Sequence, residues 1–122
     1  MTDKLLVMTL CGSRREAQAM AGALLRQRLI ACANLGGPVE SRYRWQGREE
    51  RAREYPLLLK TTRARFTQVE REIRRRHSYQ VPEIVALEIA RGSAAYLRWM
   101  AEVTAPPRPK SAAKPSAKSK RR

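Results

Sequence analysis

One long candidate hairpin, spanning residues 29–62, constrains the fold of this 122-residue chain more than any other feature. Its first arm, residues 39–45, alternates apolar and polar side chains with the period of two that is typical of a β-strand. Its second arm ends in the apolar run 55–61, and Gln46-Gly47 between the arms suits a tight turn because glycine adopts positive φ readily. At roughly 3.3 Å per residue, arms of a dozen residues would reach about 40 Å, farther than so small a domain covers, so we expect the hairpin to pack against a partner.

A turn at Gln46-Gly47 also predicts the register of the two arms. Tyr43 and Trp45 fall on one face of the first arm together with Val39, and we expect a neighbouring chain to cover that face. The opposed residues form two favourable charge pairs and one like-charged pair, namely Arg44 with Glu49, Glu40 with Arg53, and Arg42 with Arg51.

The net charge of +15 is divided unevenly between a folded region and a basic tail. Residues 105–122 contain seven Lys or Arg and no acidic residue, which leaves +8 on residues 1–104. Those first 104 residues suffice for one domain with a single core. The tail has no aromatic or large aliphatic residue, so we predict that it is disordered and attracts nucleic acid or another polyanion without sequence preference. The alternative is a solubilising extension with no partner.

No targeting or membrane segment is predicted near the N-terminus. The apolar run 5–10 is shorter than a secretory signal requires and far shorter than the 20 or so residues of a membrane span. Cys11 and Cys32 do not make a disulfide framework. We therefore expect a cytoplasmic protein with reduced thiols and no membrane association.

Hydrophobic periodicity predicts five further strands and helices, two before the hairpin and three after it. Ser13 and Glu16 form a capping box, in which Glu16 returns to the Ser13 amide, and the apolar stripe that follows includes Leu25. In the second helix, pairs of Glu70 with Arg74 and Glu72 with Arg76 are expected on the solvent side. The predicted elements beyond the hairpin are a buried strand at 4–11, a helix at 14–29, a helix at 62–77, a buried strand at 84–89 and a helix at 94–103.

The order β-α-β-β-α-β predicts an α+β fold of the ferredoxin-like kind with an added C-terminal helix. Right-handed crossovers give an antiparallel sheet with its four strands in the order 4-1-3-2. The end of the first strand, the start of the first helix, the end of the second helix and the start of the last strand then share one edge. Cys11, Ser13, His77 and Glu83 are therefore expected near one another, with Cys32 at the opposite edge and no disulfide between the cysteines.

Five motifs occur in order along the chain: Cys32-Ala33-Asn34, residues 43–48, residues 58–61, the stretch His77-Ser78-Tyr79-Gln80-Val81-Pro82-Glu83-Ile84, and residues 95–99. Together they resemble the CutA family of divalent-cation tolerance proteins over residues 5–103. The resemblance implies a homotrimer similar in architecture to PII signalling proteins, with the long hairpin packed across neighbouring subunits. It also implies an association with copper and other divalent metals, and no catalytic activity.

The same resemblance indicates a candidate metal site formed by Cys11, His77 and Glu83. The family's proposed metal contacts fall on Cys11 and on the end of the second helix, where some members have paired histidines and this chain has Arg76-His77. A thiolate and an imidazole would favour copper over magnesium or calcium, and the Arg76 guanidinium predicts a modest affinity. Each residue also has an explanation that involves no metal. The helix dipole would stabilise a protonated His77, Glu83 would pair with Arg76 or an arginine of the hairpin, and Cys11 would be a small buried residue.

No catalytic or cofactor-binding residue is predicted, because the chain lacks a nucleophile with a positioned base, a phosphate-binding glycine loop and a cysteine-rich zinc pattern. Three classes of function therefore remain. The first is a trimeric metal-tolerance protein, as the resemblance implies. The second is a PII-like module that binds a small anionic effector in the clefts between subunits, for which the start of the first helix, Arg14, Arg15 and Lys60 are suitable. The third is an interaction protein whose tail contacts a polyanion.

Overall fold

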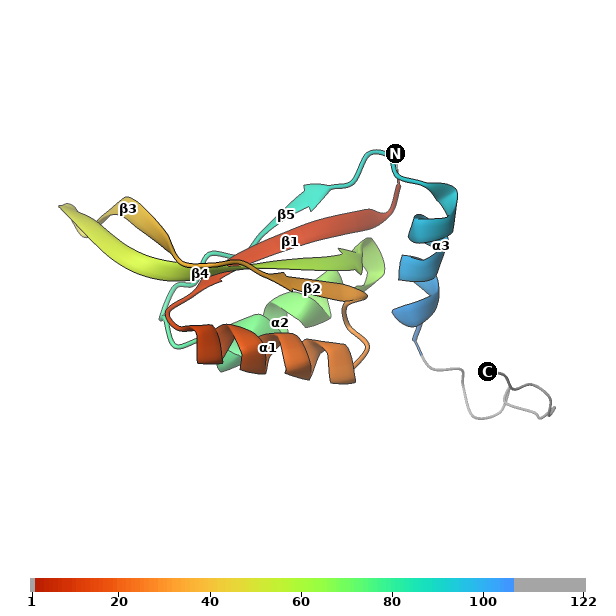
Figure 1. Cartoon of the computed structure of the whole chain (residues 1–122), viewed down its shortest axis with the longest axis horizontal. Helices are drawn as coiled ribbons and strands as arrows, with labels where there is room; N and C mark the ends of the chain where they lie inside the picture. Colours follow the sequence, from red (N-terminus) through yellow and green to blue (C-terminus); the bar gives the residue numbers. More distant parts are fainter. Residues whose placement is uncertain (1, 107–122) are drawn as a thin grey trace.

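The structure is a computed structural model that describes residues 2–106 (Figure 1). All elements predicted beyond the hairpin are present, and most of the predicted tail lies outside the described residues. In chain order they are β1 (Lys4–Cys11), α1 (Arg14–Arg26), β2 (Cys32–Leu35), β3 (Val39–Trp45), β4 (Arg48–Thr62), a 3-10 turn η1 (Arg63–Arg65), α2 (Phe66–Arg76), β5 (Val85–Glu88) and α3 (Ala94–Val103).

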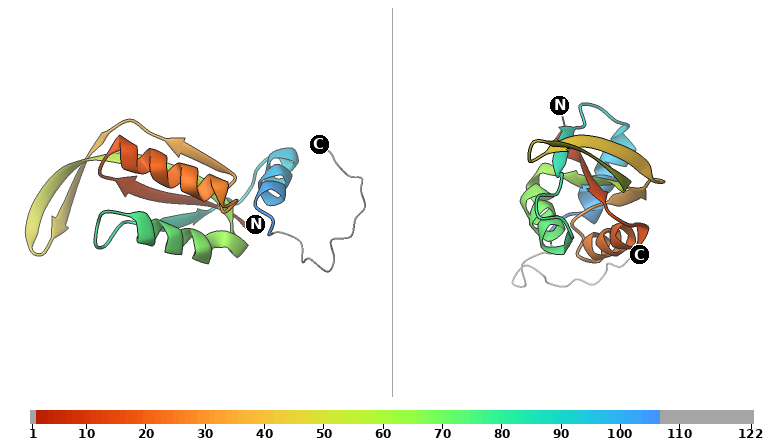
Figure 2. Two further views of the ribbon diagram at one scale, coloured as in Figure 1. Left: turned by 90° about the horizontal axis from the view of Figure 1, so that it is seen from below. Right: turned by 90° about the vertical axis from the view of Figure 1, so that its left-hand side faces the viewer.

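The sheet runs in the order β2-β4-β1-β5 with every neighbouring pair antiparallel, and β3 pairs with the distal part of β4. The predicted order 4-1-3-2 is therefore confirmed, except that the first arm of the hairpin is divided into β2 and β3. The division falls at Gly36-Gly37-Pro38, where the Gly36 amide donates to the Pro56 carbonyl at 2.9 Å. Both α1 and α2 lie side by side against one face of the sheet, and α3 stands at its end (Figures 1 and 2).

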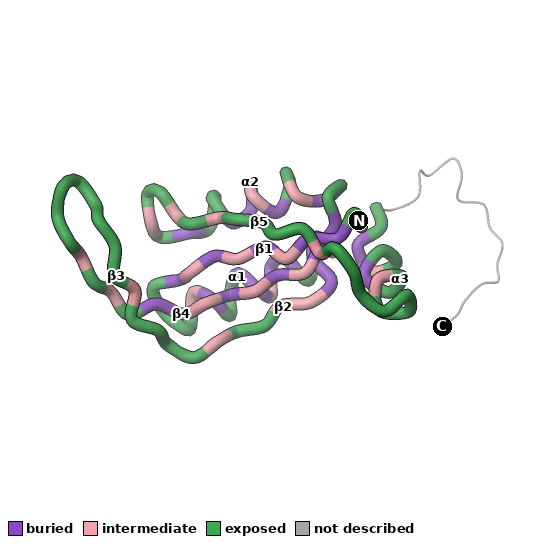
Figure 3. The backbone as a smooth tube through the Cα atoms, turned by 90° about the horizontal axis from the view of Figure 1, so that it is seen from above, coloured by how far each residue is buried: buried purple, intermediate pink, exposed green. Residues whose placement is uncertain are grey.

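The register of the hairpin is the predicted one. Gln46 and Gly47 form its turn, with φ angles of 51° and 79°. Because β4 has 15 residues, its distal half and β3 project beyond the two helices, and they are largely exposed in the single chain (Figure 3). The paired residues include Arg44 with Glu49, Glu40 with Arg53, and Arg42 with Arg51.

The core lies between the sheet and the two helices. Alternate residues of β4, Leu57 and Leu59, are fully buried on the helix side, as the period of a strand requires. Its other members come from β1, α1, α2 and the chain after α1, and they include Leu5, Val7, Cys11, Ala17, Met20, Ala21, Leu24, Leu29, Ile30, Val69 and Ile73.

Helix α1 starts and ends slightly differently from the prediction. The Ser13 hydroxyl accepts from the Glu16 amide at 3.1 Å as expected, but the Glu16 carboxylate accepts from the Gly12 amide at 3.1 Å, not from Ser13. The helix ends at Arg26, after which Arg28 adopts a φ of 58° and returns the chain to the core. Leu25 is exposed, so its place in the buried stripe was wrong; it faces away from the sheet.

In helix α2 the predicted pair of Glu70 and Arg74 is present at 2.7 Å. The prediction that Glu72 lies on the solvent side was wrong. Glu72 is buried at the edge of the core, because its position follows that of the buried Val69 by one helical turn. It accepts hydrogen bonds from both Arg75 and Arg76. A buried carboxylate thus gains two cationic donors from the same helix.

Strand β5 was predicted to be buried and is exposed throughout. It lies at the edge of the sheet and pairs with β1 alone among the described residues. Val85 and Leu87 remain 42% and 54% exposed, so an apolar edge strand stays open in the single chain. Among residues 2–106, no helix is long and apolar enough to cross a membrane.

Candidate functional site

A pocket of about 770 Å³ lies between the projecting hairpin and the loop that follows α2, and of the predicted metal-site residues it is lined by Glu83. Tyr43 and Trp45 of β3 line one side, because the period of the strand directs both of them to the same face. Tyr79 and Glu83 of the loop line the other side, Glu54 of β4 contributes a carboxylate, and Arg42 of β3 contributes a guanidinium. The pocket therefore has aromatic walls and carries both acidic and basic groups.

A hydrogen bond between Tyr79 and Glu54 ties the loop to the hairpin. The Tyr79 hydroxyl donates to Glu54 Oε2 at 2.8 Å, and the Glu54 residue is only 7% exposed. Burial and the Glu54 carboxylate both raise the pKa of the Tyr79 phenol. The phenol therefore stays protonated and acts as a hydrogen-bond donor at neutral pH.

Behind this pair, the His77 ring is completely buried, and both of its nitrogens have backbone partners. Nε2 lies 2.8 Å from the Leu10 carbonyl, which can only accept, and Nδ1 lies 3.1 Å from the Tyr79 amide, which can only donate. These two partners fix the neutral tautomer with the proton on Nε2. Neither nitrogen has a lone pair left for a metal ion.

Cys11 is fully buried and belongs to the core. Burial raises the pKa of its thiol to about 12, and the carboxylates of Glu16 and Glu54 add to the effect. A metal binds the thiolate, so a thiol held protonated to this degree is a poor ligand. The structure agrees with the alternative that Cys11 is a small core residue.

Glu83 is exposed at the rim of the pocket. Among the described residues it makes no ion pair with Arg76 or with an arginine of the hairpin. Within residues 2–106, no three His, Cys, Asp or Glu side chains converge as a group that could hold a metal ion. Cys11, His77 and Glu83 therefore share an edge of the sheet without offering a copper ion a common set of donor atoms in the single chain.

Sequence reasoning missed the role of Glu16, which joins the two helices at this edge. Its carboxylate accepts from the Ser78 amide at 2.7 Å and from the Ser78 hydroxyl at 3.2 Å, in addition to the Gly12 amide. The capping pattern identified Glu16 as a helix-start residue, but only the packing of α1 against the end of α2 provides Ser78 as a partner. The hydrogen bond between Glu54 and Tyr79 was also missed, because only the fold brings the loop after α2 next to β4.

Within the single chain, the residues suggested for a small anionic effector are not brought together. The Glu16 carboxylate already binds the Gly12 amide at the start of α1, where an anion would have been expected. The Arg14 guanidinium lies 5.2 Å from the centre of the Tyr55 ring. Lys60 Nζ lies 5.8 Å from the ring centre of Tyr96 in α3. The predicted effector site between subunits stays a prediction.

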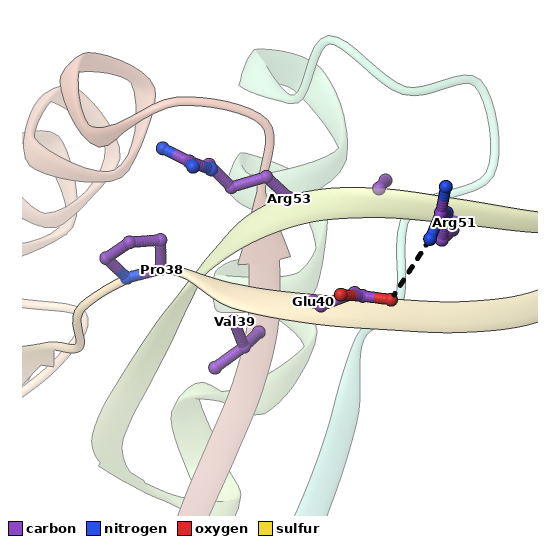
Figure 4. Close-up of a pocket in the computed structure, with 6 residues that line it drawn as sticks. Pro38, Val39, Glu40, Arg51 and Arg53 are labelled. Carbon is purple, nitrogen blue, oxygen red and sulfur yellow. Dashed lines mark ion pairs between the residues drawn. The ribbon is translucent and has the colours of Figure 1, made fainter.

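A second, open pocket of about 370 Å³ crosses the base of the hairpin (Figure 4). Pro38 and Val39 line one side, and Arg51 and Arg53 line the other. Glu40 lies within it, 3.9 Å from Arg51. The same carboxylate accepts a hydrogen bond from Arg42 at 3.0 Å, so Glu40 is shared between two arginines of the hairpin.

Comparisons with known proteins all lead to one family. The model of the CutA1 divalent ion tolerance protein matches residues 5–103. The divalent-cation tolerance protein CutA of Thermus thermophilus is 44% identical over 92 residues, which cover 75% of this chain and 89% of the relative. The solved structure of the Thermus thermophilus protein has a TM-score of 0.81 at 40% identity and covers 83% and 98% of the two chains. A structure described as the periplasmic divalent cation tolerance protein CutA from Archaeoglobus fulgidus has a TM-score of 0.80 at 34% identity, with coverages of 83% and 98%.

Proposed function

The chain belongs to the CutA1 family of divalent ion tolerance proteins, and from this premise we propose that it contributes to divalent-cation tolerance in the cytoplasm as a homotrimer that binds copper or a related cation. The observation that carries the proposal is the family match over residues 5–103, which includes nearly every described element. The features that support the trimer and the metal contact are separate, and each has its own experiment.

The trimer is supported by apolar surface that the single chain leaves open. Tyr43 and Trp45 on the hairpin are 45% and 44% exposed, and Leu87 on the edge strand is 54% exposed. Exposed apolar groups on a long hairpin and on an open strand edge are typical of surfaces that pair with another chain.

Light scattering of the full chain at micromolar concentration tests the assembly. We expect a trimer for the native protein and a smaller species for Trp45→Arg or Leu87→Arg, because each places a charge in a buried interface. Leu25→Arg is the matched control, since Leu25 is equally exposed but lies on α1, and it should leave the assembly unchanged. A native protein that is monomeric under these conditions would contradict the proposal.

For the metal, we propose that the contact is made by Glu83 and not by Cys11 with His77. Glu83 is exposed at the pocket rim, whereas both His77 nitrogens are hydrogen-bonded and the buried Cys11 thiol, with its pKa raised to about 12, is a poor ligand in the single chain. A carboxylate contact is expected to follow the general order of divalent affinities, with Cu²⁺ bound more tightly than Zn²⁺.

Calorimetric titration of the metal-free protein with Cu²⁺ and Zn²⁺ distinguishes the alternatives. Glu83→Gln should weaken copper binding by about 10-fold or more, the scale of losing one ligand interaction of about 1.4 kcal/mol. The double variant Cys11→Ser with His77→Ala should bind as tightly as the native chain, and Glu102→Gln, an exposed glutamate on α3, is the control. Loss of affinity in the double variant with none in Glu83→Gln would reverse the assignment.

Growth in elevated copper tests the biological role. Cells that lack their own CutA protein should tolerate more copper when they express this chain, and less benefit is expected from Glu83→Gln at equal protein level. Equal sensitivity with and without the chain would count against a tolerance function.

The cytoplasm is proposed because Cys11 and Cys32 are both unbonded thiols, as expected in a reducing compartment. The Archaeoglobus fulgidus relative is described as periplasmic, which makes the compartment a direct question for experiment. Fractionation of cells that produce the untagged chain should recover it with cytoplasmic markers, and recovery in a periplasmic extract would refute the proposal.

A further inference from the structure

The positive charge of the folded region is concentrated in its helical layer. Residues 13–28 and 66–76, which form α1, α2 and their flanking residues, contain eight arginines and three glutamates, a net charge of +5 in 27 residues. The other 77 of residues 1–104 together carry +3. The two adjacent helices therefore form the most basic surface of the domain.

Five of these arginines point away from the sheet, and we name Arg15, Arg26, Arg71, Arg74 and Arg75 the arginine face. Arg15 and Arg26 are three helical turns apart on the same side of α1, opposite the buried Ala17, Met20 and Leu24. Arg71, Arg74 and Arg75 lie within one turn of α2, opposite Val69 and Ile73. All five are exposed, and the two helices lie side by side (Figure 2).

Three of the five arginines are not neutralised within the molecule. Arg15, Arg26 and Arg71 have no carboxylate within ion-pair distance among the described residues, whereas Arg74 pairs with Glu70 at 2.7 Å. Arg75 shares the single carboxylate of Glu72 with Arg76. The hydrogen bond from Arg76, together with Arg75, lowers the pKa of Glu72 to about 2, which is consistent with a local excess of positive charge.

The shape of the face suits a polymer more than a small ligand. A shallow pocket of about 440 Å³ on α2 is lined by Thr67, Glu70, Arg71, Arg74 and Arg75. On α1, the small residues Ala19 and Gly22 separate Arg15 from Arg26. No aromatic side chain is exposed on α1 or α2, so base stacking has no platform here.

We propose that the arginine face binds the phosphate backbone of duplex nucleic acid, an interaction that is independent of divalent-cation tolerance. Arg15 and Arg26 are 11 positions apart, a rise of about 16 Å along the helix axis, comparable with about five phosphate spacings of 3.4 Å along one strand. Backbone contacts without base contacts make the binding independent of sequence. An anionic membrane is less well matched, because Leu25 is the one large apolar side chain that these two helices expose.

The C-terminal end of α3 lies against the start of α2. Arg65, directly before α2, donates to the Thr104 carbonyl at 2.9 Å. Residues 105–122, which contain seven Lys and Arg, follow Thr104 in the chain. The tail variant in the experiment below therefore separates their contribution from that of the arginine face.

Fluorescence anisotropy with a random-sequence DNA duplex of about 20 base pairs, over a series of salt concentrations, tests the proposal. Three full-length variants each remove four positive charges by substitution with Gln. The arginine-face variant changes Arg15, Arg26, Arg71 and Arg75. The sheet-side variant, which covers the hairpin and α3 region, changes Arg44, Arg48, Arg91 and Arg98, and the tail variant changes Lys110, Lys114, Lys118 and Lys120.

The arginine-face variant should bind the duplex about 10-fold or more weakly than the native chain near 100 mM salt. The slope of its log K against log salt concentration should be less negative by about 3 to 4. The sheet-side variant should remain within about 2-fold of the native chain at the same salt. Equal losses in these two variants would reduce the effect to net charge and overturn the proposal, as would loss in the tail variant alone. Binding of the native chain to phosphatidylserine vesicles but not to the duplex would also overturn it, and unchanged thermal melting excludes misfolding as the cause of any loss.

Discussion

Replacement of Glu16 by Ala should destabilise the fold, although the residue is near the surface. The carboxylate accepts from the Gly12 amide at 3.1 Å, from the Ser78 amide at 2.7 Å and from the Ser78 hydroxyl at 3.2 Å, and its side chain is 16% exposed. Hydrogen bonds to a charged group contribute about 1.5–3 kcal/mol each when well protected. Allowing for partial exposure and for water that reaches the orphaned amides, we expect a loss of about 2–4 kcal/mol in the free energy of unfolding.

Urea denaturation at one fixed protein concentration measures this loss, because assembly makes stability depend on concentration. Glu102→Ala, which removes an exposed glutamate from α3, should change stability by less than about 0.5 kcal/mol. Ser78→Ala removes the hydroxyl donor and leaves the amide, so we expect a loss of about 1 kcal/mol. In the double variant of Glu16 and Ser78 the two losses should not add, since they share a hydrogen bond.

The outcome that refutes this reasoning is a Glu16→Ala protein as stable as the Glu102→Ala control. That result would mean that water satisfies the Gly12 and Ser78 amides at no cost, and that the packing of α1 against the end of α2 holds this edge without the carboxylate. Additive losses in the double variant would show that Glu16 and Ser78 act separately.

Three further predictions concern neighbouring groups. Tyr79→Phe should cost about 1.5–3 kcal/mol in urea denaturation, because the buried Glu54 loses its phenol donor; a neutral effect would imply that water replaces it. Since the pKa of Glu72 is lowered to about 2, its stabilising contribution is present above the unfolded pKa near 4.5 and is lost as pH falls toward 2, and Glu72→Gln should flatten this part of the stability profile. At pH 8 iodoacetamide should alkylate Cys32 and leave Cys11 unmodified in the native protein, because burial raises the Cys11 pKa to about 12; mass spectrometry that found both thiols modified would contradict this.

Local patterns in the chain were sufficient for most of the architecture. The period of two in residues 39–45 and the turn at Gln46-Gly47 predicted β3 and its register with β4, because a two-residue turn leaves one pairing for each strand residue. The strand at 4–11 and the helix at 94–103 have the observed bounds. The order of the sheet followed from the handedness of crossovers, which depends on chain order alone.

Predictions about burial failed where a neighbouring element decided the outcome. Strand β5 has the apolar composition of a central strand, yet its place at the sheet edge leaves it exposed in one chain. Glu72 was predicted on the surface as part of a helical charge pair, but it follows the buried Val69 by one turn and lies on the side of α2 that packs against the core. The charge-pair pattern does not show which side of the helix packs inward, and the predicted sheet order did not show that the edge strand would stay uncovered in one chain.

The chemistry of the candidate site was decided by tertiary structure. The sequence by itself determined that Cys11 and His77 approach the same edge of the sheet, because each lies at a predicted end of an element. It did not determine the state of their donor atoms. The Leu10 carbonyl and the Tyr79 amide occupy the two nitrogens of His77, and burial keeps the Cys11 thiol protonated. Proximity follows from the order of elements, whereas the state of the donor atoms depends on burial and on contacts such as that of His77 with the Leu10 carbonyl, 67 residues apart in the chain and 2.8 Å apart in the fold.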